Sequence, residues 1–169
     1  KRVKSCDCVV FGFTPGEGAR SDAFGALLLG LYDEGRPVYV GRVGTGFADA
    51  DLKGIRSTLD GMRVDNLWFS DPDVPEGSAW VRPRLVAQVG YHEVTRDLRL
   101  RAPRFIGFRD DKPPELCGLA QIRPQRLDEY YSKRDFSVTP EPAGGYTPGA
   151  GNSFVVQEHH SRRTHWDLR

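Results

Sequence analysis

The sequence predicts a small, mostly β domain with one helix, followed by an irregular C-terminal extension. Short apolar runs rich in β-branched and aromatic residues alternate with turn sequences such as PGEG and DEGRP. A single segment has its apolar residues at helical spacing. Beyond residue 117 the chain is rich in Pro, Gly, Arg and polar residues, which is typical of a linker. The 169 residues suffice for one domain and some additional chain, but not for two ordinary domains.

Three strands are expected before the helix. Residues 8–14 (CVVFGFT) form a β-branched and aromatic run that the PGEG turn closes. Residues 26–32 (ALLLGLY) are apolar on both faces, as in a buried strand, and residues 38–43 (VYVGRV) follow the DEGRP turn. The helix is expected over residues 49–62, with Asp49 or Asp51 in its first turn. One helical face collects four apolar residues at steps of three and four: Leu52, Ile55, Leu59 and Met62.

Two more strands follow a Pro-, Asp- and Gly-rich loop. Residues 85–91 alternate apolar and other side chains, and TRDL is expected to turn the chain into the last strand. That strand is expected to place Arg99 and Arg101 on one face, opposite Leu98 and Leu100, before it resumes as RFIGF. A helix between the third and fourth of five short strands predicts an OB-type Greek-key barrel, whose surface commonly binds oligonucleotides. An SH3-like barrel or a small α+β sheet fits the same order less well.

The composition argues against disulfide-rich, secreted and membrane-spanning proteins. Three cysteines do not suggest a disulfide framework, and no segment resembles a signal peptide or reaches the roughly 20 apolar residues of a membrane span. We therefore expect a cytoplasmic protein without a membrane partner. The formal net charge is only +1, but basic residues cluster in KRVK, RDLRLRAPR and RPQR, which permits a basic face.

The end of the last predicted strand carries a candidate anion site. In RFIGFRDDKPPE, Arg109, Asp111 and Lys112 stand where side chains project into solvent or into a neighbouring site. Arginine offers a bidentate fork and lysine a compact charge, so the two cations could bind a polyphosphate. Asp111 would orient one of them or help to hold a metal.

These segments resemble a known family in their order along the chain. GFTPGEGARSDAFGALLLGLYDEG, YVGRVGTGF and WVRPRLVAQVGYHEVTRDLRLRAPRFIGFRDDKP are similar to the C-terminal OB domain of ATP-dependent DNA ligases, and closest to the ligase module of prokaryotic end-joining ligases. The resemblance covers roughly residues 1–115. In that family the R-x-D-K strand end is ligase motif six. The resemblance implies that Arg109, Asp111 and Lys112 contact the β- and γ-phosphates of ATP while the enzyme adenylates its own lysine.

The same resemblance implies cofactors and partners. ATP and Mg would serve the parent ligase, and the partners would be nicked duplex DNA and the nucleotidyltransferase domain of the same ligase. The candidate DNA-binding residues of the basic face are Lys4, Arg99, Arg101 and Arg104. The KxDG sequence, which holds the family's lysine nucleophile, does not occur here. We therefore expect the isolated chain to be inactive alone.

The C-terminal part resembles a second domain of end-joining ligases. YSKRDFSVTPEPAGG followed by SFVVQEHHSRRTHWDLR is similar to the start of their 3′-phosphoesterase domain. Its H-x5-H-x-D pattern implies that His159, His165 and Asp167 are manganese ligands, in a site that is incomplete because the family uses a further histidine. Imidazole with carboxylate suits such divalent ions. The expected organisation is an OB domain at 1–117, a linker at 118–152 and a truncated phosphoesterase start at 153–169.

Two alternative functions come from other classes of protein. An independent single-strand-binding OB module would stack bases on aromatic residues interleaved with cations, and Phe11, Phe13, Tyr39 and Tyr91 are the candidates. A 3′-end phosphoesterase remnant is the other alternative.

Overall fold

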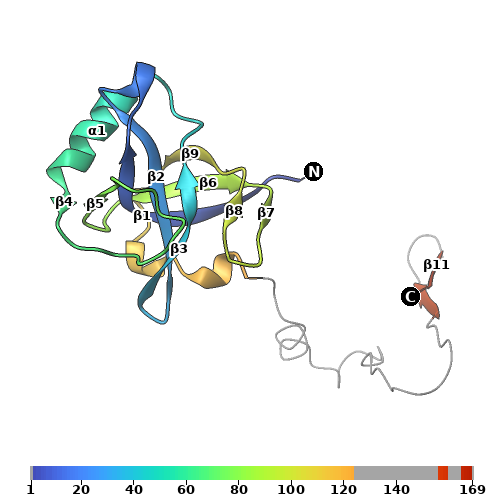
Figure 1. Cartoon of the computed structure of the whole chain (residues 1–169). Coiled ribbons are helices and arrows are strands. Elements are labelled where there is room, and N and C mark those ends of the chain that lie inside the picture. Colours follow the sequence, from blue (N-terminus) through green and yellow to red (C-terminus); the bar gives the residue numbers. More distant parts are fainter. Residues whose placement is uncertain (1, 124–155, 160–164, 169) are drawn as a thin grey trace. The chain divides into compact units, whose positions relative to one another are not determined.

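The computed structural model describes residues 2–123 and the backbone of two short strands near the C-terminus (Figure 1). The chain divides into two compact units, Lys1–Pro124 and Gln125–Arg169. The first unit is mostly β with one α-helix, which confirms the predicted fold class. No helix in the described part of the chain is long and apolar enough to cross a membrane.

Five long antiparallel strands build the first unit. Their order along the hydrogen bonds is β3-β2-β1-β6-β9. The amide of Phe105 in β9 donates to the carbonyl of Thr45, just after β3, at 2.9 Å. The two ends of this strand path therefore meet, as the closure of an OB-type barrel requires. The strands are β1 (Lys4–Pro15), β2 (Phe24–Asp33), β3 (Arg36–Val43), β6 (Val86–Tyr91) and β9 (Arg104–Phe108).

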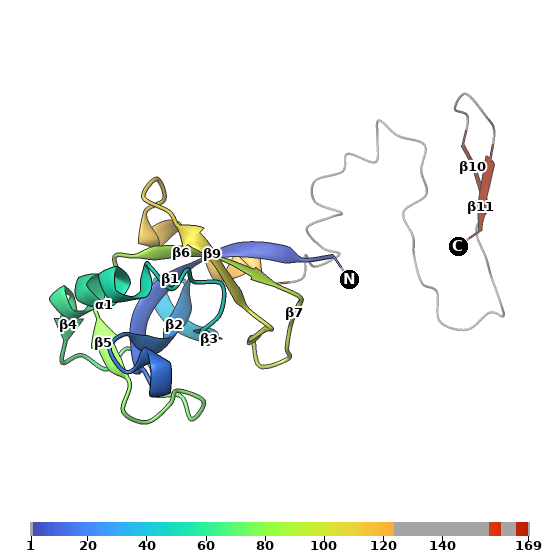
Figure 2. The same ribbon diagram turned by 90° about the horizontal axis from the view of Figure 1, so that it is seen from above.

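Shorter elements extend and cover this sheet. β5 pairs with the second half of β1 and with β4, while β7 and β8 form a separate hairpin. Figures 1 and 2 place α1 and the β7–β8 hairpin on opposite sides of the unit. These elements are η1 (Gly18–Arg20), α1 (Leu52–Gly61), β4 (Arg63–Val64), β5 (Ala79–Val81), β7 (Glu93–Val94), β8 (Leu100–Arg101), η2 (Pro114–Leu116) and η3 (Leu119–Gln121).

The barrel interior is filled by aromatic and aliphatic side chains. Phe11 packs against Phe69 with ring centroids 4.8 Å apart. The four aromatic residues that a base-stacking surface would need are all at most 4% exposed: Phe11, Phe13, Tyr39 and Tyr91. Since stacking needs an accessible ring face, the structure disfavours the independent single-strand-binding module.

The helix begins three residues later than predicted, because the preceding residues form a turn in which the Asp51 amide donates to the Ala48 carbonyl at 3.0 Å. Its predicted apolar face is present. Leu52 and Leu59 are buried, and Ile55 and Met62 pack partly against the core.

The chain turns at TRDL as predicted, but the strand that follows begins only at Leu100. Leu98 has a φ of 61°, and its amide bonds to the Thr95 carbonyl in a turn. Arg99 follows this turn and precedes β8, so the expectation that Arg99 and Arg101 share one strand face is wrong.

The predicted linker also begins too early. Leu119 and Ile122 are only 1% and 5% exposed, and the amide of Tyr32 at the end of β2 donates to the Cys117 carbonyl at 2.8 Å. Residues 118–123 therefore belong to the barrel, and the compact unit ends at Pro124 instead of residue 117. Residues 124–155 lie outside the described residues, so the rest of the linker stays a prediction.

In the second unit, the described residues form an antiparallel pair of strands, β10 (Val156–His159) and β11 (His165–Leu168). Its register pairs His159 with His165 and Gln157 with Asp167.

Candidate functional site

The candidate anion site lies at the end of β9, where the barrel strand becomes a turn. The Arg109 amide donates to the Val86 carbonyl at 2.8 Å, which extends the β6–β9 pairing by one residue. The chain then turns through Asp111 and Lys112 into the Pro113–Pro114 pair. A cleft of about 310 Å³ opens here, with Arg109 and Lys112 in its wall.

Arg109 holds two carboxylates. Its Nε and Nη2 donate to the two oxygens of Asp111 at 3.1 and 2.7 Å, a bidentate pair. Its Nη1 donates to Oδ2 of Asp7 at 3.0 Å. The pKa of Arg109 is raised by Asp111 first and by Asp7 next, whereas the Arg109 hydrogen bond lowers the pKa of Asp111. The guanidinium is therefore fixed in direction and remains charged.

Lys112 meets the same carboxylate. Its Nζ donates to Oδ2 of Asp7 at 3.0 Å, so one oxygen accepts from both cations. The side chains of Arg109 and Lys112 are 35% and 23% exposed. Within the described residues, Arg109 uses three of its five N–H donors and Lys112 one of three. The structure thus brings together the three residues predicted from the strand end and leaves N–H groups on both cations for an anion.

Asp7 is the part of the site that sequence reasoning missed. It lies in β1 and is only 8% exposed. Gln121 in η3 holds its backbone: the Asp7 amide donates to Oε1 of Gln121, and Nε2 of Gln121 donates to the Asp7 carbonyl, both at 3.0 Å. The available signal was an acidic residue inside the apolar run CDCVV, where a charge needs a partner.

The predicted DNA-binding cations differ in their surroundings. Lys4, Arg101 and Arg104 are exposed, although Arg101 pairs with Glu93 at 2.6 Å. The register places Lys4 opposite Tyr91 and Arg104 opposite Gly90, so both flank the same end of β6. The three exposed cations therefore gather near one end of the sheet, while Arg109 follows the other end of β9.

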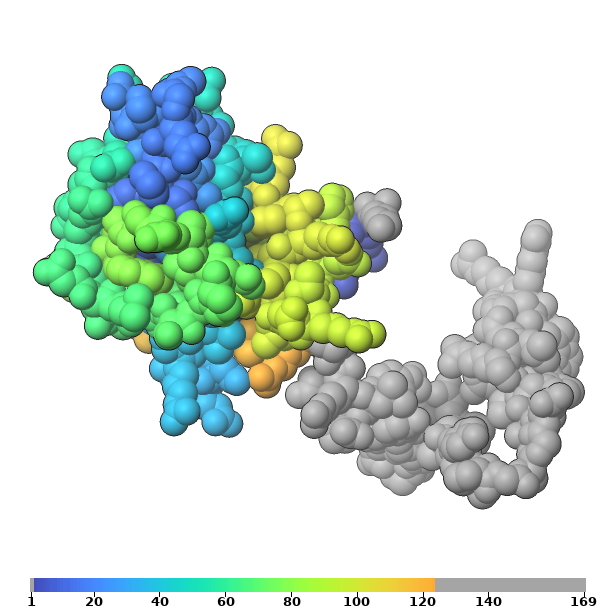
Figure 3. Space-filling view, in the orientation of Figure 1, coloured from blue at the N-terminus to red at the C-terminus, as the bar shows by residue number. Residues whose placement is uncertain are grey.

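Arg99 is held by ion pairs and hydrogen bonds to other parts of the first unit. Its guanidinium bonds Asp71, Asp73 and the Tyr39 carbonyl, and its side chain is 21% exposed. Figure 3 shows the surface of this contact, where the loop before β5 (green) lies against the β7–β8 region (yellow-green).

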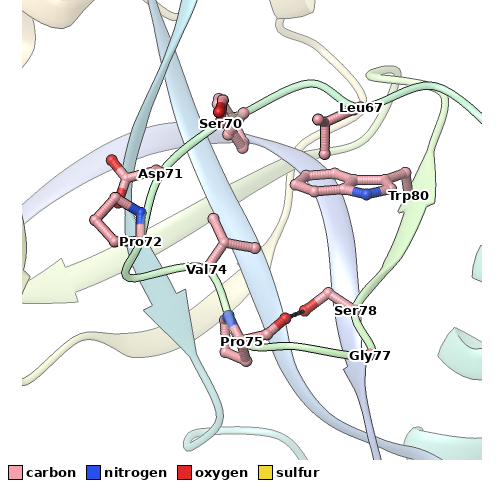
Figure 4. A pocket seen from close by; sticks show the side chains of 10 residues that line it. Leu67, Ser70, Asp71, Pro72, Val74, Pro75, Gly77, Ser78 and Trp80 are labelled. Carbon is pink, nitrogen blue, oxygen red and sulfur yellow. Dashed lines mark hydrogen bonds between the residues drawn. The ribbon is translucent and has the colours of Figure 1, made fainter.

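A further cleft of about 480 Å³ lies on the loop between β4 and β5 (Figure 4). Trp80 and Val74 form its apolar walls, and Asp71 lies at its edge with the carboxylate committed to Arg99. Among the described residues that line it there is no basic side chain, so they offer no positive charge for a phosphate.

The predicted manganese ligands lie on the β10–β11 hairpin, where only the backbone is described. Paired positions of an antiparallel ladder share a face, as do positions two apart on a strand, so His159, His165 and Asp167 occupy one face. In the described part of the first unit, no cluster of three or more His, Cys, Asp or Glu residues could hold a metal ion.

Comparisons with known proteins find relatives among DNA ligases. Residues 20–112 match the family model of the ATP-dependent DNA ligase C-terminal region, a span that includes Arg109, Asp111 and Lys112. The multifunctional non-homologous end joining protein LigD of Mycolicibacterium smegmatis is 41% identical over 113 residues, which are 64% of this chain and 15% of that protein. LigD of Pseudomonas aeruginosa is 41% identical over 111 residues, 62% of this chain and 13% of that protein. The chain thus spans about a seventh of the length of these relatives.

A solved structure has the same fold. The crystal structure of the ligase domain from M. tuberculosis LigD superimposes with a TM-score of 0.63 at 35% identity, covering 69% of this chain and 39% of that one. Mycobacterial DNA ligase D complexed with ATP and MES gives a TM-score of 0.58 at 32% identity, with 69% and 38% coverage. Since the family model matches more than half of the sequence, this chain belongs to the family of C-terminal regions of ATP-dependent DNA ligases.

Proposed function

We propose that this chain closes on ATP through Arg109 and Lys112 and binds the β- and γ-phosphates while the ligase that carries it adenylates its own lysine. The observation that carries the proposal is the pair of cations at one cleft, both held by Asp7 and both with unused N–H donors. A related ligase was solved with ATP, which supports the nucleotide as the ligand class.

The chemistry of this step needs positive charge at the leaving group. Attack by the lysine on the α-phosphate expels pyrophosphate, so negative charge develops on the β- and γ-phosphates. Cations that folding has already placed stabilise this charge strongly, because they do not have to be reoriented during the reaction. Asp111 orients Arg109 through its bidentate pair. Magnesium would accompany ATP and neutralise further phosphate charge.

DNA is the proposed second ligand. Lys4, Arg101 and Arg104 offer exposed cations near one end of the sheet, which suits phosphates of a nicked duplex. Arg99 would first have to leave Asp71 and Asp73, so we assign the initial contacts to the other three. Sealing nicks in end joining would then be the activity of the whole ligase, in which the nucleotidyltransferase domain is the partner of this chain.

The hairpin keeps its proposed role in a phosphoesterase domain. The backbone register that puts His159, His165 and Asp167 on one face is compatible with a shared manganese ion.

The test separates the adenylation step from the sealing step. In the ligase that carries this chain, Arg109→Ala or Lys112→Ala should slow self-adenylation by about 2–4 kcal/mol of activation free energy, the cost of removing one such charge contact. Sealing by enzyme that already carries AMP should change far less, because the β- and γ-phosphates have left. Arg123→Ala removes an arginine that pairs only with Asp33 in the described residues and serves as the matched control. Equal losses in both assays would contradict the assignment.

A further inference from the structure

Asp7 is the only buried charged residue among residues 2–123, and it is not in the family-matched span. We propose that Asp7 is a positioning residue, which joins Arg109 and Lys112 into one two-cation phosphate-binding unit. The identity of the phosphate ligand rests on the proposed function, whereas the contacts of Asp7 with the two cations do not depend on that function.

The geometry begins with the shared oxygen. Arg109 Nη1 and Lys112 Nζ each lie 3.0 Å from Oδ2 of Asp7. Two cations this close repel each other, and the carboxylate charge between them offsets that repulsion. Without it, the flexible lysine side chain would move into solvent, where its charge is better hydrated.

Asp7 contacts the two cations from the protein side and does not line the cleft in which a ligand would bind. The cleft wall includes Arg109 and Lys112 but not Asp7, which is buried in β1. The unused N–H groups of both cations are therefore available to an anion while Asp7 keeps its two hydrogen bonds. A phosphate need not displace the carboxylate, so Asp7 orients the donors instead of competing for them.

The surroundings of Asp7 are poorly explained by stability alone. Its Oδ1 is buried and has no hydrogen-bond partner among the described residues. A buried acceptor without a donor destabilises a fold, so an apolar residue would serve the barrel better at this point of β1. Gln121 nevertheless fixes both backbone groups of Asp7. The backbone of Asp7 is therefore held in place although its side chain costs stability. This combination fits a residue that positions the two cations.

The first experiment measures tripolyphosphate binding to the 169-residue chain by calorimetry. Asp7→Asn keeps the shape of the side chain and removes its charge. We expect about a tenfold weaker affinity, the size of one charge-assisted contact. Asp33→Asn removes a carboxylate from the Arg123 pair elsewhere on the barrel and should leave the affinity within about twofold. Unchanged or tighter binding by Asp7→Asn would overturn the proposal, because Asp7 would then only neutralise the cations.

A double-mutant cycle distinguishes positioning from loss of fold. Asp7→Asn should have little further effect on tripolyphosphate affinity in a Lys112→Ala background, because no second cation remains to be held in place. Additive losses would overturn the proposal. If Asp7→Asn does not fold, Gln121→Ala removes the support of the Asp7 backbone, together with one hydrogen bond to the Gly118 carbonyl, and should weaken binding in the same direction. An unchanged affinity in a folded Gln121→Ala chain would then count against it.

The second experiment uses the ligase that carries this chain. Asp7→Asn should raise the KM for ATP in self-adenylation about tenfold and leave sealing by the AMP-bearing enzyme within twofold. Equal loss in both steps would indicate a structural role alone and overturn the proposal. If Arg109→Ala and Lys112→Ala leave adenylation unchanged, the proposed function fails, and the tripolyphosphate assay still decides the role of Asp7.

Discussion

The segment that follows Pro113 and Pro114 offers a direct test of where the barrel ends. Leu119 and Leu116 stand three residues apart, yet Leu119 is 1% exposed in the core and Leu116 is 66% exposed. Truncating a fully buried leucine removes its transfer free energy and leaves a cavity, which typically costs about 2–5 kcal/mol. We expect about 2–4 kcal/mol for Leu119→Ala, because a short 3-10 segment at the barrel edge can partly close the gap.

Leu116→Ala is the matched control, since it removes the same atoms from solvent-exposed positions. Its free energy of unfolding should stay within about 0.5 kcal/mol of the parent value. The assay is urea denaturation of the full chain, followed by tryptophan fluorescence, with Trp68 and Trp80 packed partly against the core. If both variants stay within about 0.5 kcal/mol of the parent, residues 118–123 do not pack as the structure shows, and the boundary predicted at 117 would stand.

Four further outcomes are expected. Iodoacetamide at pH 8 should label the folded chain slowly and the urea-unfolded chain rapidly by mass spectrometry, because Cys6, Cys8 and Cys117 are buried and burial raises the pKa of Cys117 to about 11. Because the pKa of Cys117 is about 11 in the folded chain and about 9 in the unfolded chain, the unfolded chain loses this proton at lower pH. The free energy of unfolding should therefore fall as pH rises from about 9 towards 11, and it should fall less in Cys117→Ala. Duplex DNA binding should weaken with salt by a slope of about −0.9 per phosphate contact, and Arg104→Ala should reduce that slope by about one contact; an unchanged slope would exclude Arg104. Manganese calorimetry on the chain should show only weak binding, and tight binding that is lost in His165→Ala would show a complete site.

The strands were predictable because their signals are local. Residues 26–32 are apolar on both faces, and β2 indeed lies between β1 and β3 with most of its side chains buried. The helix followed from a spacing that only a helix satisfies, and its start was misplaced because the turn around Asp51 also suits acidic residues. Turn chemistry marked the ends of most strands.

Contacts between distant parts of the chain were not predictable in this way. Asp7 is 102 residues from Arg109 in sequence, and no periodicity reports such a pairing. The turn at TRDL is predicted, but Leu98 and Arg99 are expected already in the last strand, because leucine rarely adopts the positive φ that Leu98 has. Residues 118–123 were assigned to a linker because a 3-10 segment is too short to show a periodic apolar face.

The missed boundary and the missed site residue have one physical origin. β1 pairs with β6 at Asp7, but its pairing with β2 begins only at Val9, so among residues 2–123 no strand pairs with the other edge of β1 at Asp7. The side-chain amide of Gln121 takes that place by bonding both backbone groups of Asp7. A backbone group left without a partner in a buried region would destabilise the strand end. The segment after residue 117 therefore completes the sheet where the carboxylate that holds Arg109 and Lys112 is anchored, and shortening the chain at 117 should weaken phosphate binding as well as stability.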